Sequence, residues 1–330
     1  MSMHYGTVAG IEKPISRIAL GCGGFSLDRQ EKANALLDAF VAAGGTVLDT
    51  AHVYSNGESE RALGHWLQDR NARARVVIMT KGAHPNLTDW LPRLTPEAIA
   101  QDLRESLDRL QTDKIDLYLL HRDDPAQPVG PIVECLNEQV VQGKISAFGG
   151  SNWTHQRIAE ANVYAAAQGL TGFTASSPHF ALAVAVKFGL PGLVILSGNH
   201  AALDWYRSSQ LPLFVWSSQA GGFFSDRFSP DNTENHGAIA SYARPENWER
   251  ARRAKLLAQK YGATPTQIAL AWLFQIQLNL FAVIGPSTLP HLNDCLGALE
   301  ISLTPEETAW VNLEELNYGN HDSTPPDCQN

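Results

Sequence analysis

Residues 115–121 read IDLYLLH, and this stretch decides the fold of the chain. Its almost unbroken apolar character is typical of a strand buried on both faces, as in a parallel sheet covered by helices. His121 stands directly after the apolar run, at the carboxyl end of the predicted strand. The stretch therefore predicts a buried parallel strand with an ionisable side chain at its end.

Seven further apolar runs, rich in β-branched residues, recur along the chain, so that the eight runs are about 38 residues apart on average. Segments with helical spacing of apolar residues separate them, and this alternation predicts βαβ units and a parallel sheet. Eight strands of this kind suit an α/β fold of the closed (β/α)8 type, the TIM barrel. The predicted strands are residues 18–21, 46–48, 76–80, 115–120, 145–149, 172–174, 213–216 and 281–284.

Three Thr-Pro pairs mark predicted helix starts, because a threonine hydroxyl caps the first turn and proline fits its first position. Thr95 precedes an apolar stripe at helical spacing, while Thr264 and Thr304 begin capping-box patterns. The helix after Thr304 is an addition beyond the last barrel strand. Residues 221–245, rich in Gly, Ser, Asn, Asp and Pro, predict a long loop or lid after the seventh strand. We expect one domain over residues 1–330, with a loosely held tail at 318–330.

The composition is that of a folded globular protein. Hydrophobic residues make up 44% and charged residues 18%, which excludes disordered and low-complexity classes. The net charge of −9 repels nucleic acid and anionic membranes, so we expect neither as a partner. Polar residues, glycines and a proline interrupt the uncharged run at residues 161–186, which therefore does not predict a membrane span.

The cysteines bear on the cellular compartment. Cys22, Cys135, Cys295 and Cys328 are far apart in sequence, with no C-x-x-C pair, which argues against a zinc site or a disulfide framework. The histidines are too scattered to predict a metal site. The first residues show no basic segment followed by an apolar stretch, so we expect no signal peptide and a cytoplasmic protein.

Ionisable side chains follow three consecutive predicted strands. Asp49, Lys81 and His121 stand at these strand ends, and Tyr54 lies five residues beyond Asp49. In (β/α)8 barrels the carboxyl ends of the strands face the active site, so a closed barrel would bring the four together. A phenol is a useful proton donor when a neighbouring cation stabilises its conjugate base, and Lys81 could supply that cation. Asp49 would hold Lys81 charged and oriented, and His121 could hydrogen-bond the same substrate oxygen.

Such a group suits reduction of a carbonyl, in which a hydride reaches carbon and a proton reaches oxygen. No G-x-G-x-x-G follows the first predicted strand, so the Rossmann dinucleotide turn is absent from this sequence. A lysine at a strand end is also what a Schiff-base lyase or aldolase uses, so Lys81 leaves that second enzyme class open.

The chain resembles the aldo/keto reductases over nearly its whole length. The resemblance is carried by ordered segments: DTA with Tyr54, TKG at 80–82, LLHR at 119–122, GGSNW at 149–153, VWS at 215–217 and VIGPS at 283–287. It implies a (β/α)8 barrel that binds NAD(P)H without a Rossmann motif and reduces an aldehyde or ketone to an alcohol. It makes Tyr54 the general acid, Lys81 and Asp49 its activating pair, and His121 the group that orients the carbonyl.

The resemblance also implies a cofactor site. Ser151 and Asn152 would contact the nicotinamide carboxamide, with Ser177 in place of a glutamine, and Trp216 would stack on the nicotinamide. The 217–227 loop would follow the pyrophosphate, and the 287–295 segment would hold the adenosine end, although it contains no Lys or Arg. We therefore expect NADPH, with NADH or dual use as alternatives. The remaining implied cofactor residues are Gly21, Ser217, Ser218, Gln219, Gly221, Arg227, Gly285, Ser287, Thr288, His291, Asp294 and Cys295.

The substrate residues are expected in the loops at the barrel mouth. Aromatic side chains there suit either an apolar carbonyl or the face of a sugar ring. An alternative function is a cofactor-binding regulatory subunit of the same fold with little turnover, and we expect a monomer or a small homo-oligomer. The candidate substrate residues are Phe25, Val53, Trp90, Trp153, His179 and Phe180.

Overall fold

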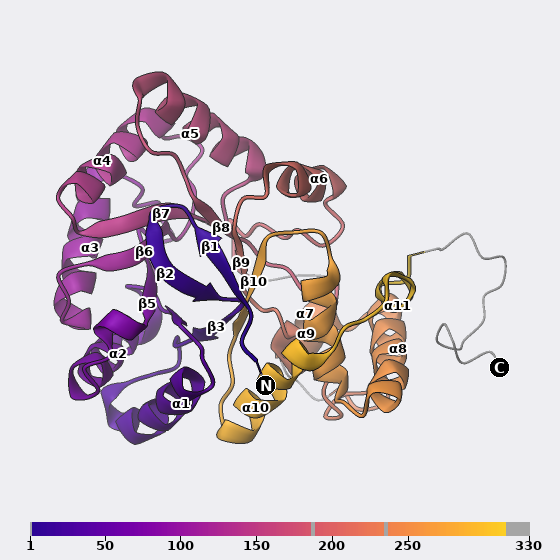
Figure 1. Ribbon diagram of the computed structural model, residues 1–330. Helices are drawn as coiled ribbons and strands as arrows, with labels where there is room; N and C mark the ends of the chain where they lie inside the picture. The colour runs from indigo at the N-terminus through magenta and orange to yellow at the C-terminus, as the bar shows by residue number, and fades with distance from the viewer. Residues whose placement is uncertain (1, 186–188, 234–236, 315–330) are drawn as a thin grey trace.

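A computed structural model describes residues 2–185, 189–233 and 237–314. In these residues eight strands, all paired in parallel, close into a barrel, and helices surround it (Figure 1). The predicted (β/α)8 fold is therefore confirmed. In barrel order the strands are β10 (Leu280–Ile284), β3 (Ile18–Gly21), β4 (Val47–Asp49), β5 (Val77–Gly82), β6 (Ile115–Leu120), β7 (Ile145–Ser151), β8 (Ala175–Ser177) and β9 (Leu213–Val215).

The sixth barrel strand lies three residues beyond its predicted position. Residues 172–174 were expected to form it, but the strand is Ala175–Ser177. The Asn162 side chain of the preceding helix accepts a hydrogen bond from the Phe173 backbone and donates one to it, at 2.7 and 3.3 Å. Because the Asn162 side chain uses both the N–H and the carbonyl of Phe173, strand pairing with β7 begins only at Ala175, opposite Gly149.

An antiparallel hairpin that the sequence analysis did not predict precedes the barrel. It consists of β1 (Tyr5–Val8) and β2 (Ile11–Ser16) and lies across the barrel in Figure 1. Val8 and Ile15 are buried in one cluster with barrel-interior side chains that include Phe214 and Phe281. The hairpin therefore contributes apolar side chains to the barrel interior, which is filled rather than hollow.

The predicted helix starts are confirmed. Thr95 caps α3 (Pro96–Leu110), and full capping boxes begin α9 (Pro265–Gln275) at Thr264 and α11 (Pro305–Val311) at Thr304. The last of these is the predicted addition after the final strand. The other helices around the barrel are α1 (Gln30–Ala42), α2 (Glu58–Asp69), α4 (Val129–Val141), α5 (His155–Gln168), α6 (His200–Ser209), α8 (Pro245–Tyr261) and α10 (Leu289–Gly297).

The long segment after β9 is also confirmed, and it carries a short helix, α7 (Gly237–Tyr242). Phe223 and Tyr242 are buried, and the Phe223 ring lies 4.5 Å from that of Trp248. This segment is therefore packed onto the barrel at several points, while residues 234–236 lie outside the described residues.

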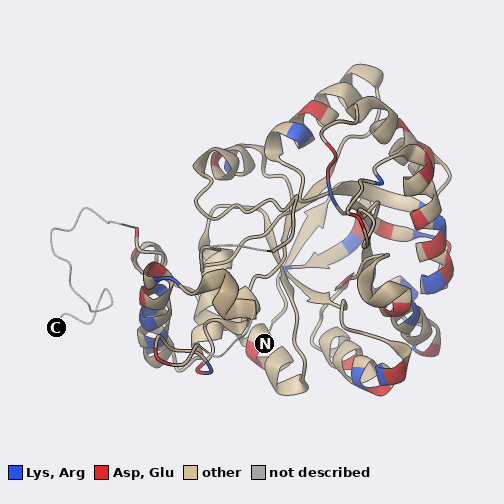
Figure 2. Cartoon of the chain, turned by 180° about the vertical axis from the view of Figure 1, so that it is seen from behind, with Lys and Arg blue, Asp and Glu red and all other residues tan. Residues whose placement is uncertain are grey.

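Charged side chains cluster on the outer helices, and the barrel strands carry few of them (Figure 2). Within the described ranges, no helix combines the length and apolar character needed to cross a membrane. The predicted loose tail at 318–330 lies outside the described residues.

Candidate active site

Three neighbouring strands bring the predicted catalytic side chains to one end of the barrel. β4 pairs with β5, and β5 pairs with β6, with Asp49 opposite Met79 and Lys81 opposite Leu119. Asp49 and Lys81 therefore lie near the carboxyl ends of their strands, and His121 follows directly after β6. The parallel register alone accounts for this arrangement.

A left-handed turn places Tyr54 beside these strand ends. Tyr54–Gly57 forms a short 3-10 segment in which Ser55, Asn56 and Gly57 have positive φ angles. At Gly57, φ is +86° and a Cβ atom would lie 2.7 Å from the Arg109 guanidinium, so glycine is required. Arg109 donates a hydrogen bond to the His52 carbonyl at 2.9 Å, which anchors the loop that leads into the turn.

Lys81 is the centre of the cluster. Its Nζ atom donates hydrogen bonds to the Asp49 carboxylate and, at 3.0 Å, to the Thr50 carbonyl, and lies 5.1 Å from the Tyr54 ring centroid. Burial lowers the pKa of Lys81, but the attraction of Asp49 and Tyr54 outweighs burial and raises it overall. The pKa of Asp49 is raised, because its burial outweighs the attraction of Lys81. Lys81 is therefore held as an ammonium group next to the phenol.

His121 completes the cluster as a neutral imidazole. Its ring lies 5.5 Å from the Tyr54 ring and 4.7 Å from the His84 ring. Burial, followed by repulsion from Lys81, lowers the pKa of His121 well below its usual value. Nδ1 is buried without a hydrogen-bond partner, which leaves Nε2 as the ring nitrogen able to meet a substrate oxygen.

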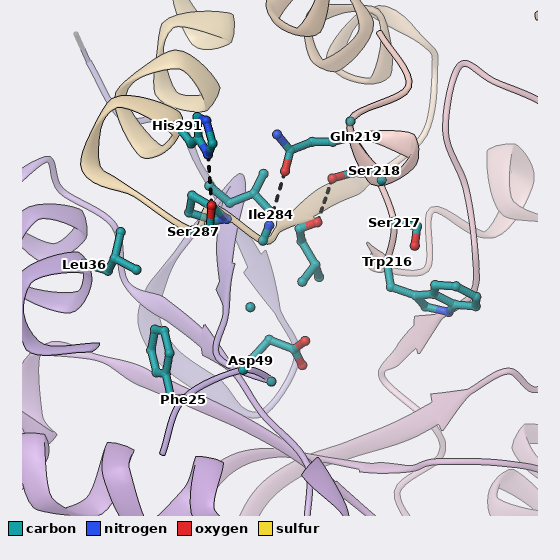
Figure 3. Close-up of a pocket in the computed structure, with 18 of the residues that line it drawn as sticks. Phe25, Leu36, Asp49, Trp216, Ser217, Ser218, Gln219, Ile284, Ser287 and His291 are labelled. Carbon is teal, nitrogen blue, oxygen red and sulfur yellow. Dashed lines mark hydrogen bonds between the residues drawn. The ribbon is translucent and has the colours of Figure 1, made fainter. Parts of the chain in front are cut away.

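A cavity of about 760 Å³ opens beside this cluster. Tyr54, Asp49 and Trp216 line one end, and Ser287, His291 and Asp294 line the other. In Figure 3, Phe25 and Leu36 lie on one side of the cavity. A volume of this size is in the range of small-molecule and cofactor sites. Other predicted residues that line the cavity are Gly21, Phe25, Ser217, Ser218, Gln219, Gly221, Arg227 and Gly285.

Hydrogen bonds fix the cavity wall formed by the loop after β9. Ser218 donates to the Val283 carbonyl at 2.6 Å, and the Gln219 amide accepts from the Gly285 backbone at 3.2 Å (Figure 3). The other end of the same amide donates to the Cys295 sulfur at 3.0 Å. Gln219 therefore joins the β9 loop to β10 and to α10.

Ser151, Asn152 and Ser177 form a polar group at the ends of β7 and β8. The Ser151 hydroxyl donates to the Ser177 carbonyl at 3.1 Å, and the Asn152 amide donates to the Ser151 oxygen at 3.0 Å. The Ser177 hydroxyl is buried without a hydrogen-bond partner. A buried orphan hydroxyl beside a serine and an asparagine fits a polar ligand group such as a carboxamide.

Two cationic side chains that the sequence analysis did not predict line the cavity. Arg29 and Lys32 stand on the same wall as Ala33 and Leu36, at the start of α1, which packs beside α10. The spacing 29, 32, 33, 36 places all four on one helix face. That spacing was visible in the sequence, but only the barrel shows that this face lines the same cavity as Ser287 and His291.

Several predicted contact residues lie elsewhere. Trp153 is fully buried beside Phe173, at 4.9 Å between ring centroids, and is not among the residues that line the cavity. His179 is fully buried as well, and its Nε2 atom is 2.7 Å from the Tyr242 hydroxyl, so it does not reach the cavity. Phe180 packs on Trp272 at 5.6 Å. In each case a side chain after a strand end turns into the packing between barrel and helices.

Other predicted residues stand near the cavity without lining it. Cys295 is buried behind Gln219, and Thr288 uses its hydroxyl to cap α10 by accepting from the His291 backbone. Val53 lines a separate pocket of about 330 Å³ next to His52 and His84, and Trp90 packs on His84 at 5.6 Å. Within the described ranges, no group of three or more His, Cys, Asp or Glu side chains is placed to hold a metal ion.

The comparisons with known proteins agree with the barrel fold. The sequence model of the aldo/keto reductase family matches residues 17–313. Aldo-keto reductase ausK of Aspergillus calidoustus is 29% identical over 300 residues, covering 87% of this chain and 73% of that protein. Aryl-alcohol dehydrogenase GME11368 of Pestalotiopsis microspora is 27% identical over 296 residues, covering 88% of this chain and 74% of that protein.

Solved structures show the same similarity. A crystal structure of an aldo-keto reductase from Klebsiella pneumoniae in complex with NADPH has a TM-score of 0.71 at 25% identity and covers 95% of both chains. A thermostable aldo-keto reductase, Tm1743, has a TM-score of 0.72 at 23% identity, with 94% of this chain and 99% of that one covered, and supports the fold alone.

Proposed function

Because the chain belongs to the aldo/keto reductase family and is an NAD(P)H-dependent oxidoreductase, we propose that it reduces an aldehyde or ketone to the alcohol, with NADPH as the cofactor and Tyr54 as the proton donor. One observation carries this proposal. Tyr54 and Asp49 line a cavity whose volume suits a cofactor, with buried Lys81 bonded to Asp49 and the buried His121 ring 5.5 Å from that of Tyr54.

The cluster is suited to transfer a proton to a bound carbonyl. Bound NADPH supplies the hydride that reaches the carbonyl carbon. Tyr54 gives its phenolic proton to the carbonyl oxygen, and the Lys81 ammonium stabilises the phenolate that remains. Asp49 keeps Lys81 charged and oriented through their hydrogen bond. Neutral His121 can donate a hydrogen bond to the same oxygen through Nε2.

The polar residues around the cavity would hold the cofactor. Ser151, Asn152 and Ser177 would take the carboxamide, since the buried Ser177 hydroxyl lacks a partner. The Trp216 ring, which lines the cavity, would contact the nicotinamide. The loop residues from Ser217 to Arg227 would follow the pyrophosphate, and Ser287 with His291 would hold the adenosine ribose.

Arg29 and Lys32 favour NADPH over NADH in this proposal. The 287–295 segment has no Lys or Arg, so its hydroxyls and backbone N–H groups lack a full positive charge for a 2′-phosphate. Arg29 and Lys32 line the same cavity from the start of α1, which packs beside α10, and supply that charge. Both side chains are exposed, and Arg29 has only the exposed carboxylate of Asp28 nearby, at 3.7 Å from its Nε atom, with which a phosphate would compete.

The proposal has a direct test. The purified protein is titrated with NADPH and with NADH while tryptophan fluorescence is recorded, because Trp216 would be quenched by a bound nicotinamide. Loss of reduced-nicotinamide absorbance is then followed with a panel of aldehydes that includes aryl aldehydes, which the name of the Pestalotiopsis relative suggests. Saturable quenching and oxidation with any panel member support the proposal. Absence of binding by either cofactor would overturn it.

The two alternatives give different results in the same assays. A Schiff-base lyase needs an uncharged lysine, whereas the Asp49 pair and the raised pKa keep Lys81 protonated. Borohydride trapping of a Lys81 adduct would favour the lyase. Tight cofactor binding with negligible turnover over the whole panel would favour the regulatory subunit.

A further inference from the structure

One lysine and one arginine side chain are buried in the described part of the chain, and they differ in one respect. Lys81 is 2% exposed and Arg122 is 7% exposed. Lys81 has Asp49 as its counterion. Arg122 makes no ion pair with any carboxylate of the described residues. Burying a charge without a counterion is costly, so an unpaired buried guanidinium needs an explanation.

The hydrogen bonds of Arg122 leave one edge of the guanidinium unused. Nη1 donates to the His121 carbonyl at 2.9 Å. Nε is buried without a partner, and Nη2 makes no hydrogen bond to the described residues. Nε and Nη2 form the side of the guanidinium that binds a carboxylate with two parallel hydrogen bonds. The free edge is therefore the one suited to an anion with two oxygens.

Arg122 stands just after the carboxyl end of β6, beside the catalytic cluster, and is not itself among the residues that line the 760 Å³ cavity. It follows His121, whose ring lies 5.5 Å from that of Tyr54 and 4.7 Å from that of His84. Its charge acts on all three rings: it helps to lower the pKa of His121 and of His84, and the phenolate form of Tyr54 attracts it. An anion paired with Arg122 would thus lie within electrostatic reach of Tyr54, His121 and His84.

The nearest acid in the sequence is not available as a counterion. The Asp123 carboxylate is 3.3 Å from Nε of Arg157, and both side chains are 10% exposed. His84 offers no further donor toward the mouth through Nδ1, because that atom is 2.7 Å from the Pro85 carbonyl. A single positive charge is therefore left unbalanced, and a singly charged carboxylate balances it.

We propose that Arg122 binds a carboxylate on the substrate, so that the enzyme acts on carbonyl compounds that carry a carboxylate group. This inference rests on the proposed reductase function and narrows its substrate class. Arg122 is a binding residue here, distinct from the four groups that transfer or stabilise the proton.

The test compares a carboxylate substrate with its neutral ester. 4-Carboxybenzaldehyde and methyl 4-formylbenzoate share the aldehyde and the ring, so the ratio of their kcat/KM values isolates the charge. For the unmodified protein we expect kcat/KM of the acid to be at least ten times that of the ester. Arg122→Met, which keeps the length of the side chain, should bring the ratio to about one, mainly through KM of the acid. Arg122→Lys should retain part of the preference.

The same ratio of kcat/KM values distinguishes a substrate-binding role of Arg122 from a purely structural one, and a matched control variant is available. Arg104→Met, on the exposed face of α3, should leave the ratio unchanged. If Arg122→Met lowers turnover of acid and ester by the same factor, Arg122 only supports the fold of the site and the inference is wrong. A preference for glyceraldehyde 3-phosphate over glyceraldehyde, without any preference for the carboxylate, would also contradict it.

A binding measurement makes the inference independent of turnover. Calorimetric titration of the Tyr54→Phe variant in the presence of NADPH should show at least tenfold tighter binding of the acid than of the ester. Arg122→Met in that background should abolish the difference. If the acid binds in this way but neither aldehyde is ever reduced, the proposed function fails and the carboxylate site stands. Equal binding of both compounds overturns the carboxylate site alone.

Discussion

Lys81 donates a hydrogen bond to Asp49 between the neighbouring strands β4 and β5, and both side chains are buried at the end of the barrel. This pair lies next to the Tyr54 ring, where an ammonium group can stabilise a phenolate. The strands fix both members through their parallel register, so neither the distance nor the direction depends on a mobile loop. The pair therefore links the stability of the barrel to its chemistry.

Tyr54→Phe should lower kcat by a factor of about 10² to 10⁴, since general acid catalysis contributes that much. The phenol is lost while the cavity keeps its shape, so the dissociation constant of NADPH should change less than about twofold. Steady-state kinetics and fluorescence titration measure the two quantities. Tyr164→Phe, on the outer helix α5, serves as the control. Full activity in Tyr54→Phe would refute the assignment of the proton donor.

Asp49→Asn should destabilise the protein by about 3–5 kcal/mol, because it leaves Lys81 charged and buried without a counterion. Replacing both residues, as in Asp49→Leu with Lys81→Met, should recover most of that stability but none of the activity. Urea denaturation gives the free energies of unfolding, and Asp69→Asn, on an exposed turn of α2, is the control. A double variant as unstable as Asp49→Asn would show that packing, not charge, dominates at this position.

Arg29→Ala combined with Lys32→Ala should raise the dissociation constant of NADPH about tenfold and change that of NADH by less than about twofold, because only NADPH carries the 2′-phosphate. Added salt should narrow the difference between the dissociation constants of NADPH and NADH, because both cations are exposed and therefore screened by counterions. Fluorescence titration at two ionic strengths gives these values. Arg61→Ala on α2, outside the cavity, should have no effect. A parallel loss of NADH affinity would assign the two cations to the pyrophosphate instead.

The protein should lose stability as the pH falls from about 6.5 to 4, partly because of His179. Burial lowers the pKa of His179 to about 4 in the folded state, against 6.5 for the free side chain. Between these values the unfolded chain binds a proton that the folded chain does not, so the free energy of unfolding decreases as the pH falls. The difference between these two pKa values corresponds to a loss of about 3 kcal/mol in the free energy of unfolding.

Urea denaturation at several pH values tests this contribution. His179→Gln cannot titrate, so the variant should lose less stability between pH 6.5 and 4 than the unmodified protein. His65→Gln, at an exposed position of α2, provides the control, because its side chain is about half exposed. Identical slopes in all three proteins would assign the acid sensitivity to other groups, of which buried His121 is the first to examine.

Much of the fold follows from short stretches of sequence. The apolar runs that end at Asp49, Lys81 and His121 identify buried strands, and the threonine-proline pairs at Thr95 and Thr264 begin helices as expected. These signals are local, because strand burial and helix capping depend on residues within a few positions of one another. Parallel pairing then brings the strand ends together without further information.

The tertiary structure decided which side chains reach the cavity. Trp153 and His179 lie near the carboxyl ends of strands, as Asp49 does, yet their side chains turn into the packing between barrel and helices. Conversely, Arg29 and Lys32 reach the cavity only because α1 packs beside α10, which begins more than 250 residues later. The unpaired state of Arg122 likewise depends on Asp123 pairing with Arg157 of α5. The sequence alone determined the barrel and the neighbourhood of its four catalytic candidates, whereas the direction of each loop side chain depends on contacts between distant segments, which no local pattern encodes.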